Sequence, residues 1–204
     1  MTENIINAII MINTWGDDSG IIGDLKSDRN VISLYHIMGR HSYLLDVNFD
    51  DKKQLEQWVG RVKAMSLPSG VPAVISIQTQ KIIEVHKKKE DFSLARYLEM
   101  KEKSHFFVQI DCPQYTKGLL VLMKKSPIIR SIVHIQGENS FTIEAIAESY
   151  KEYTKMLKRL KKLKKIKHIE TQEVISVIKY RNQILDEKGG PVYPKDDIRE
   201  LYTL

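Results

Sequence analysis

An internal repeat constrains this chain more than any other feature of its sequence. Residues 36–43 read His-Ile-Met-Gly-Arg-His-Ser-Tyr and residues 134–141 read His-Ile-Gln-Gly-Glu-Asn-Ser-Phe, an offset of 98. Further on, Ile-Gln-Thr-Gln at 77–80 is echoed by Ile-Glu-Thr-Gln at 169–172, an offset of 92. The difference predicts a short deletion in the second copy, opposite the Pro- and Gly-containing loop at 66–73. Two matches in the same order indicate a duplication.

Each copy has the same succession of predicted elements, judged by period-two alternation for strands and by apolar stripes at i, i+3, i+4 and i+7 for helices. The first copy reads as strand 5–13, helix 17–28, strand 30–38, strand 43–49, a helix with Leu55, Trp58, Val59 and Val62 on its apolar face, and strand 73–87. The second reads as strand 105–111, helix 113–125, strands 128–136 and 141–147, a helix with Tyr150, Tyr153, Leu157 and Leu160, and strand 168–180.

This order predicts an α+β protein of two tandem ferredoxin-like βαββαβ domains, of the dimeric α/β-barrel type. The predicted limits are 1–88 and 105–181 for the domains, 89–104 for a linking helix, and 182–204 for a tail that its Gly and Pro residues indicate to be a loop. Each predicted sheet has one face covered by helices and one bare, so we expect the two domains to pair through their sheets.

Composition limits the cellular setting and the partners. The single Cys112 excludes an internal disulfide framework and a Cys-based zinc motif, and no segment has the pattern of a signal peptide or a membrane helix. We therefore expect a cytoplasmic protein that does not contact membranes. Residues 1–88 carry 10 basic and 10 acidic side chains, whereas residues 105–181 carry 15 and 7, so the net positive charge lies in the second copy.

Several motifs resemble one known family. They are Gly39-Arg-His-Ser42 followed by an apolar strand, Thr79-Gln-Lys-Ile-Ile in the last strand of the first copy, Gly137-Glu-Asn-Ser140 and Thr171-Gln-Glu-Val-Ile in the second, and Lys125-Ser-Pro127-Ile-Ile at a helix exit. With these motifs, each copy resembles the effector-binding (RAM) domain of the leucine-responsive regulator (Lrp/AsnC) family. The resemblance implies domains that pair through their sheets, oligomerise, and hold a small metabolite such as an amino acid near the Gly-containing turns.

Two departures from the family modify this expectation. Family members begin with a helix-turn-helix domain, but here the first predicted strand starts at Ile5, so we expect no sequence-specific DNA binding by the chain itself. The Asp that the family carries after Gly-x-x is replaced by Ser42 and Ser140, which can form hydrogen bonds but offer no counter-charge to an ammonium group.

The resemblance implies a ligand site at the two turns and the matching threonines. The candidate residues are Gly39, Arg40, His41, Ser42, Thr79, Gly137, Glu138, Asn139, Ser140 and Thr171. The alternative is that both are ordinary hairpin turns, in which glycine only supplies a positive φ angle. No cofactor and no metal site are predicted, because no cluster in the sequence has metal-ligand spacing.

Two further functions stay open beside ligand binding. His36 and His134 occupy matching positions, and with His41 they could supply acid or base chemistry to an enzyme on this scaffold. A lysine-rich helix could bind a polyanion non-specifically through Lys158, Arg159, Lys161, Lys162, Lys164 and Lys165, although such charge runs are more often solvated faces. RNA recognition by base stacking is disfavoured. Tyr43 and Phe49 could stack on bases in the first copy, but the matching face of the more basic second copy, Phe141, Ile143, Ala145 and Ala147, is mostly aliphatic.

Taken together, these features predict a stand-alone sensor or regulatory module that binds a small metabolite at a domain interface. It would form homo-oligomers and act on transcription through a partner protein that carries the DNA-binding domain. The sequence favours this module over an enzyme, since no nucleophile–base motif, P-loop or dinucleotide-binding glycine pattern is present.

Overall fold

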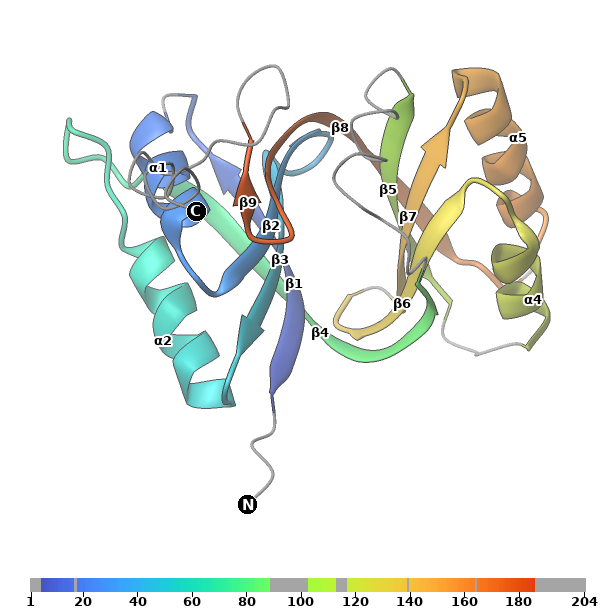
Figure 1. Cartoon of the computed structure of the whole chain (residues 1–204), viewed down its shortest axis with the longest axis horizontal. Helices are drawn as coiled ribbons and strands as arrows, with labels where there is room; N and C mark the ends of the chain where they lie inside the picture. The colour runs from blue at the N-terminus through green and yellow to red at the C-terminus, as the bar shows by residue number, and fades with distance from the viewer. Residues whose placement is uncertain are drawn as a thin grey trace, which may run out of the picture.

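The computed structural model of the chain describes residues 5–16, 18–88, 103–112, 117–138, 140–163 and 165–185. Within these ranges, the order strand, helix, strand, strand, helix, strand occurs twice (Figure 1). The first half comprises β1 (Ile6–Thr14), α1 (Ser19–Ser27), β2 (Val31–Met38), β3 (Tyr43–Phe49), α2 (Lys52–Lys63) and β4 (Val74–Lys88). The second half comprises β5 (Ser104–Asp111), α4 (Lys117–Lys125), β6 (Ile129–Gln136), β7 (Phe141–Ala147), α5 (Tyr150–Lys161) and β8 (His168–Tyr180), followed by β9 (Gln183–Ile184).

The sequence repeat has a counterpart in the backbone. The bounds of α1, β2, β3 and α2, shifted by 98 residues, are those of α4, β6, β7 and α5. The central strand pairs also keep one register, because Ile10 on β1 lies opposite Thr79 on β4 and Val108 on β5 lies opposite Thr171 on β8. The extra residues of the first half lie between α2 and β4, where Ser66 and Pro72 form an isolated bridge. The predicted loop at 66–73 is therefore confirmed.

The two longer helices begin at side-chain caps in corresponding positions. The carboxylate of Asp51 accepts a hydrogen bond from the backbone N–H of Gln54 at 2.8 Å, and the hydroxyl of Ser149 accepts one from that of Glu152 at 3.3 Å. Each cap satisfies one of the amides that a helix start leaves unpaired. The apolar stripe that follows turns each helix toward the sheet.

The described strands form one antiparallel sheet that closes on itself. Their order is β2-β3-β1-β4-β6-β7-β5-β8-β9, and β2 also pairs with β8. The two junctions between the halves are therefore β4 with β6 and β2 with β8. Helices α1 and α2 cover the outside of one half, and α4 and α5 cover the outside of the other (Figure 1). Closure gives the edge strands of both halves hydrogen-bonding partners.

Three apolar cores result from this arrangement. The first lies between the sheet and α1 and α2 and includes Phe49 and Trp58. The second lies under α4 and α5, where the rings of Phe106 and Tyr153 stack with their centroids 3.6 Å apart. The third fills the interior of the closed sheet with side chains from both halves, among them Phe107. Full burial of a large apolar side chain stabilises the fold by about 2 kcal/mol, so all three clusters hold the sheet together.

The structure confirms the predicted α+β class with an antiparallel sheet, and it corrects two details. The bare faces of the two sheets do meet inside the molecule, but their edges are also hydrogen-bonded, which the sequence did not indicate. The tail was expected to be a loop from 182, yet Gln183 and Ile184 pair with β8. The reason is a tight turn in which Arg181 and Asn182 adopt positive φ, the geometry that joins two hairpin strands.

The predicted domain limits remain predictions. Residues 89–102 of the expected linking helix and residues 186–204 of the tail lie outside the described residues. None of the described helices combines the length and the apolar composition that crossing a membrane requires.

Candidate active site

The two Gly-containing turns predicted to bind a ligand lie next to each other. The guanidinium of Arg40 and the carboxylate of Glu138 are 3.7 Å apart, so an exposed ion pair connects the β2–β3 turn to the β6–β7 turn. Each glycine packs against a strand of the other half. A Cβ atom at Gly39 would lie 3.2 Å from Cγ of Gln172, and one at Gly137 would lie 3.3 Å from Cγ of Gln80. Both glycines therefore serve a close approach of backbone to side chain.

The serines of these turns bond to the ends of neighbouring strands. The Ser42 hydroxyl donates to Oδ1 of Asn13 at 3.0 Å and accepts from the backbone N–H of Thr14 at 3.3 Å. Ser140 accepts from the backbone N–H of Cys112 at 3.1 Å. These contacts give both serines a role in anchoring the turns. Asn139, the remaining turn residue of the prediction, lies outside the described residues.

The side chains of the two predicted threonines face away from the turns, although the backbone oxygen of Thr171 would lie 3.4 Å from a Cβ atom at Gly39. Thr171 accepts a hydrogen bond from the Tyr153 hydroxyl of α5 at 2.9 Å, so its side chain faces the helices. Thr79 pairs with Ile10, a member of the core under α1 and α2. Because strand side chains alternate, the neighbouring Gln80 and Gln172 face the interior instead.

The three candidate histidines also lie apart. The ring of His36 stacks on Tyr43 with centroids 5.2 Å apart, and the ring of His134 stacks on Phe141 at the same centroid distance. His41 is buried in the interior, where its Nδ1 lies 3.2 Å from Nε2 of Gln172. They do not form one acid–base centre.

A polar cavity of about 310 Å³ opens into the interior of the closed sheet and is lined by both halves. Its lining residues are Asn7, Ile32, Ser33, Tyr35, Asp46, Ile82, Val85, Arg130, Ser131, Val133, Glu144, Tyr180 and Arg181. Ligand pockets of proteins usually range from about 300 to 1,000 Å³, so this cavity fits a small molecule. Its polar groups include carboxylates, guanidinium groups, hydroxyls and phenols.

Glu144 on β7 is the carboxylate with the most defined surroundings in this cavity. Nε2 of His105 on β5 lies 3.1 Å from Glu144 Oε1, and the Ser131 hydroxyl donates to Glu144 Oε2 at 3.3 Å. Both Glu144 and His105 are largely buried, with 18% and 9% of their side chains exposed. Nδ1 of His105 is buried without a hydrogen-bond partner among the described residues. These two contacts fix the position of the Glu144 carboxylate in the wall of the cavity.

Tyr35 on β2 supplies a phenol that remains protonated. Burial raises the pKa of Tyr35 well above its usual value, and the nearby Glu144 carboxylate raises it further, while a hydrogen bond with Ser33 acts in the opposite direction. The Tyr35 ring meets the rings of His105 and Phe107 edge-on, at centroid distances of 5.7 and 5.0 Å. Tyr35 can therefore donate a hydrogen bond to an oxygen atom in the cavity over the whole physiological pH range.

Arg130 and Arg181 contribute two guanidinium groups to the cavity, beside the carboxylates of Asp46 and Glu144. Atoms Nε and Nη1 of Arg130 are buried, and the Arg181 guanidinium lies 5.7 Å from the centroid of the Tyr180 ring. The arginines face a lining that includes Val85 and Val133. Guanidinium groups bind carboxylates in a fork geometry, so the cavity can hold an anionic molecule with an apolar part.

None of these cavity residues was singled out from the sequence. In the sequence, His105 and Glu144 are single polar residues in two alternating strands, which is not unusual. They meet because His105 on β5 lies opposite Ile146 on β7, and Ile146 is two residues beyond Glu144. The repeat does carry a signal: Ser33 and Asp46 correspond to Ser131 and Glu144 at the offset of 98. Polar residues at matching inward positions of both copies indicate a shared polar cavity.

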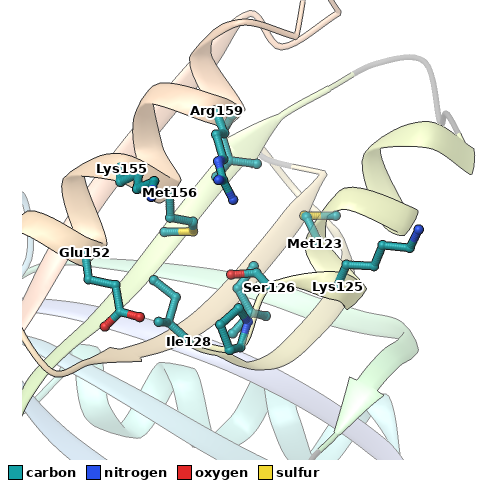
Figure 2. Close-up of a pocket in the computed structure, with 11 residues that line it drawn as sticks. Met123, Lys125, Ser126, Ile128, Glu152, Lys155, Met156 and Arg159 are labelled. Carbon is teal, nitrogen blue, oxygen red and sulfur yellow. The ribbon is translucent and has the colours of Figure 1, made fainter.

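A second hollow lies between α4 and α5, with a volume of about 400 Å³ (Figure 2). Met123, Ile128 and Met156 form an apolar floor, and Lys125, Lys155 and Arg159 stand around it. The residues predicted to bind a polyanion lie next to this hollow, and one of them, Arg159, lines it. Those that the structure describes are all exposed: Lys158, Arg159, Lys161, Lys162 and Lys165. Lys164 lies outside the described residues.

One group of described side chains is arranged as metal ligands. It consists of Glu84, His86 and His134 and lies outside the interior cavity. The sequence-based search for ligand spacing missed it, because Glu84 and His86 come from one strand and His134 from another.

Comparison with protein families matches the second half of the chain. Residues 106–184 match the sequence model of the Lrp/AsnC ligand binding domain. This range runs from β5 to β9, so the resemblance predicted for the second copy is confirmed. The resemblance of the first copy and the lack of a helix-turn-helix domain stay predictions. No curated protein matches the chain.

Several solved structures align with most of this chain. A mutant of chlorite dismutase from Candidatus Nitrospira defluvii aligns with a TM-score of 0.52 and 9% identity, over 86% of this chain and 92% of that chain. The same enzyme in complex with imidazole aligns with a TM-score of 0.51 and 9% identity, over 86% and 93%. An anthrone oxidase-like protein aligns with a TM-score of 0.48 and 13% identity, over 86% and 92%. At 9% identity, the two chlorite dismutase alignments establish a likeness of fold alone.

These findings correct the expected function. A stand-alone regulatory module was predicted and an enzyme disfavoured, but the solved structures that share the architecture over most of both chains are those of an enzyme. These comparisons therefore contradict the prediction of a regulator. It was drawn from the Lrp/AsnC likeness alone, which covers a ligand-binding domain and does not specify the consequence of ligand binding.

Proposed function

We propose that this chain is an enzyme that transfers protons on a small carbonyl-containing carboxylic acid bound in the interior cavity. The observation that carries the proposal is the Glu144 carboxylate, which lines the cavity and is held between His105 and Ser131. Buried acid–base groups from different strands around a cavity of ligand size are characteristic of catalytic sites.

The residues have separate roles in this reaction. Glu144 takes a proton from the carbon next to the substrate carbonyl, and the electron pair of that C–H bond forms a carbon–carbon double bond. The carbonyl π electrons move to oxygen, where the protonated Tyr35 donates a hydrogen bond to the developing enolate. Glu144 then returns its proton to the enolate oxygen or to carbon. The step needs no oxidant or external base.

The lining also indicates the substrate class. Arg130 and Arg181 suit a carboxylate, and Ile82, Val85 and Val133 suit an apolar substituent. We therefore expect 2-oxo acids with an apolar side chain to be preferred over pyruvate.

The test is hydrogen exchange at the carbon next to the carbonyl, followed by proton NMR in D₂O with pyruvate, 2-oxobutyrate and phenylpyruvate. The native protein should accelerate exchange above the buffer rate, most for phenylpyruvate. The variant Glu144→Gln should lose about 10²- to 10⁴-fold in rate, the usual contribution of a general base. Exchange at the buffer rate throughout, or full exchange by Glu144→Gln, would contradict the proposal.

Asp46→Asn provides the matched control. Asp46 occupies the position that corresponds to Glu144 and also lines the cavity, but Asn7 stands where the second half has His105. We expect the exchange rate of this variant to stay within about tenfold of the native rate. Loss of the general base itself would lower the rate by at least about 10²-fold. A larger loss in Asp46→Asn than in Glu144→Gln would assign the base to the other half.

The proposal includes the origin of the scaffold. We infer that the two halves are tandem Lrp/AsnC-type units that arose by duplication and diverged at the cavity. Two observations support this inference. Four helices and strands of the first half have the bounds of their counterparts after a shift of 98 residues, and the central strands of both halves pair in the same register. Further assembly into homo-oligomers is expected from the family likeness.

A second candidate function is non-specific polyanion binding by the α5 surface. It is favoured by the position of the basic residues, which line one side of the hollow between α4 and α5 and continue along the exposed face of α5. It does not compete with the cavity, because the two surfaces lie on opposite faces of the sheet.

A further inference from the structure

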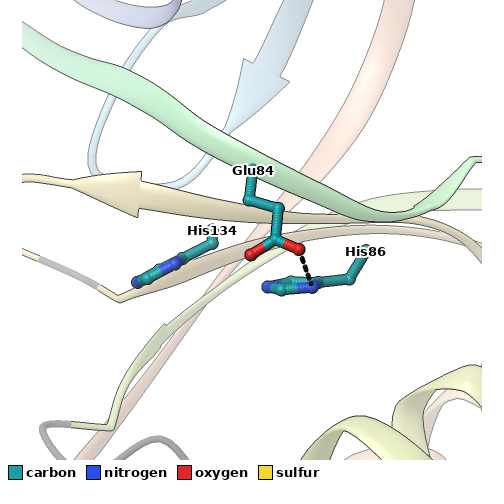
Figure 3. A group of neighbouring side chains, drawn as sticks. All are labelled: Glu84, His86 and His134. Atoms are coloured by element: carbon teal, nitrogen blue, oxygen red, sulfur yellow. Dashed lines mark ion pairs between the residues drawn. The ribbon is translucent and has the colours of Figure 1, made fainter.

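Three potential metal ligands meet on the side of the sheet that faces away from the interior cavity (Figure 3). Glu84 and His86 are two residues apart on β4, so they project to the same face. His134 lies directly opposite Glu84 on the neighbouring strand β6. The group thus spans one of the two junctions between the halves.

The geometry of the group is compact. One ligand atom from each residue can be chosen so that all three lie within 4.8 Å of one another. Nδ1 of His86 is 3.4 Å from Oε1 of Glu84, and the two imidazole rings stack with centroids 5.9 Å apart. Both rings also pack on Phe141, at 6.0 Å for His86 and 5.2 Å for His134. Phe141 belongs to the core under α4 and α5, so it limits the orientations of both imidazoles.

We propose that Glu84, His86 and His134 bind a divalent transition-metal ion, with its remaining coordination positions open to water or a small ligand. Two imidazoles and one carboxylate are the donor set of catalytic zinc sites and of non-haem iron sites. Magnesium and calcium instead require a shell of oxygen atoms, which a site with two nitrogen donors does not provide.

Binding requires only a small closure of the group. Around one ion with bonds of about 2.1 Å, neighbouring ligand atoms lie roughly 3 to 3.5 Å apart, so the donors must approach by about 1 Å. Glu84 can make this movement, because 62% of its side chain is exposed. The imidazoles are the fixed part of the site, since only 4% of the His86 side chain is exposed.

Charge also favours a transition metal over a hard cation. Lys124 of α4 lies near His86 and adds a positive charge to its surroundings. With Lys124 of α4 nearby and one carboxylate in the group, the negative charge available to attract a cation is small. Coordination bonds from nitrogen would have to supply the affinity.

The first half of the chain supplies a natural comparison. His36 corresponds to His134, and it lies opposite Ser176 on β8, as His134 lies opposite Glu84 on β4. Two residues further on, Ile178 stands where β4 has His86. The histidine is thus present in both halves, but the carboxylate and the second imidazole are present in one. His36→Gln is therefore a matched control for His134→Gln.

The experiment is titration of the metal-free full chain with Zn²⁺ by calorimetry, and with Co²⁺ by visible absorption. We expect one equivalent of Zn²⁺ to bind and the Co²⁺ spectrum to report nitrogen and oxygen ligands. His134→Gln and Glu84→Gln should each raise the Kd at least about tenfold, because even loss of an outer-shell partner costs 10- to 100-fold. His36→Gln should leave the Kd unchanged, and Mg²⁺ should not compete.

Two results would overturn the site. One is the absence of a one-equivalent Zn²⁺ binding event in the native chain, and the other is an equal Kd in native protein, His134→Gln and Glu84→Gln. The exposed position of Glu84 ensures that at least this variant folds. The outcome is independent of the proton-transfer proposal, since Glu144 faces the other side of the sheet and its exchange assay contains no metal.

Discussion

Corresponding residues of the two halves have acquired different chemistry. Glu144 and Asp46 occupy equivalent inward positions, but only Glu144 is paired with a histidine, because the first half has Asn7 in place of His105. Residue type alone did not identify Glu144 as a candidate, since an inward carboxylate in an alternating strand is not unusual. What selects it is the strand register that places His105 and Ser131 beside it. Register is a tertiary property, so this part of the site had to come from the structure.

His41 shows how a residue predicted for ligand binding serves stability. It is 6% exposed, and burial lowers its pKa, while Glu170 and Glu138 act to raise it and Arg40 to lower it. The neutral imidazole can accept a hydrogen bond at Nδ1 from the Gln172 amide. Folding therefore favours uncharged His41.

This environment predicts a pH dependence of stability. Above the ordinary histidine pKa of about 6.5, both the folded and unfolded states hold neutral His41. As the pH falls below this value, the unfolded state takes up a proton that the folded state does not, so the free energy of unfolding decreases. The variant His41→Gln should lose less stability than the native protein between about pH 7.5 and about pH 5. Urea unfolding measures this, and parallel pH curves for the two proteins would argue against it.

At the scale of elements, the sequence predicted most of what the structure has. The strands and helices follow from period-two and helical spacing, and the repeat allowed each element to be checked against its counterpart. Tyr43 and Phe49, considered for RNA stacking, are buried in the core under α1 and α2, which excludes them as a stacking platform. The element that the sequence missed is β9, since a hairpin turn at Arg181 and Asn182 leaves little signal without glycine.

Helix α5 and the residues that follow it carry the prediction of polyanion binding. Replacing Lys158, Lys161, Lys162 and Lys165 by Gln should make the protein elute from heparin at lower salt, because each lost phosphate or sulfate contact reduces counterion release. The control is Lys52, Lys53 and Lys63 replaced by Gln on the corresponding helix α2, where we expect little change. Equal elution of the native and α5-substituted proteins would show that this face is simply solvated.

At the scale of the whole molecule, the decisive feature is closure of the sheet. The sequence predicted that two domains would meet through their bare faces, and the inner faces of the two halves do meet in the interior. It could not predict that β4 would pair with β6 and β2 with β8, because edge pairing between domains leaves no periodic signal in either strand. Closure turns an interface into an enclosed volume. Both junctions enclose the cavity on the inside, and one of them, between β4 and β6, brings Glu84, His86 and His134 together on the outside.

The central claim, that the interior cavity binds and activates a 2-oxo acid, is tested most directly by a crystal structure. The crystals would contain Glu144→Gln with phenylpyruvate, since this variant should bind the compound without turning it over. The claim predicts phenylpyruvate inside the closed sheet, with its carboxylate at Arg130 or Arg181, its carbonyl oxygen at the Tyr35 hydroxyl, and C3 facing residue 144. Phenylpyruvate bound in the hollow between α4 and α5 instead, or a cavity without the compound at saturating concentration, would contradict it.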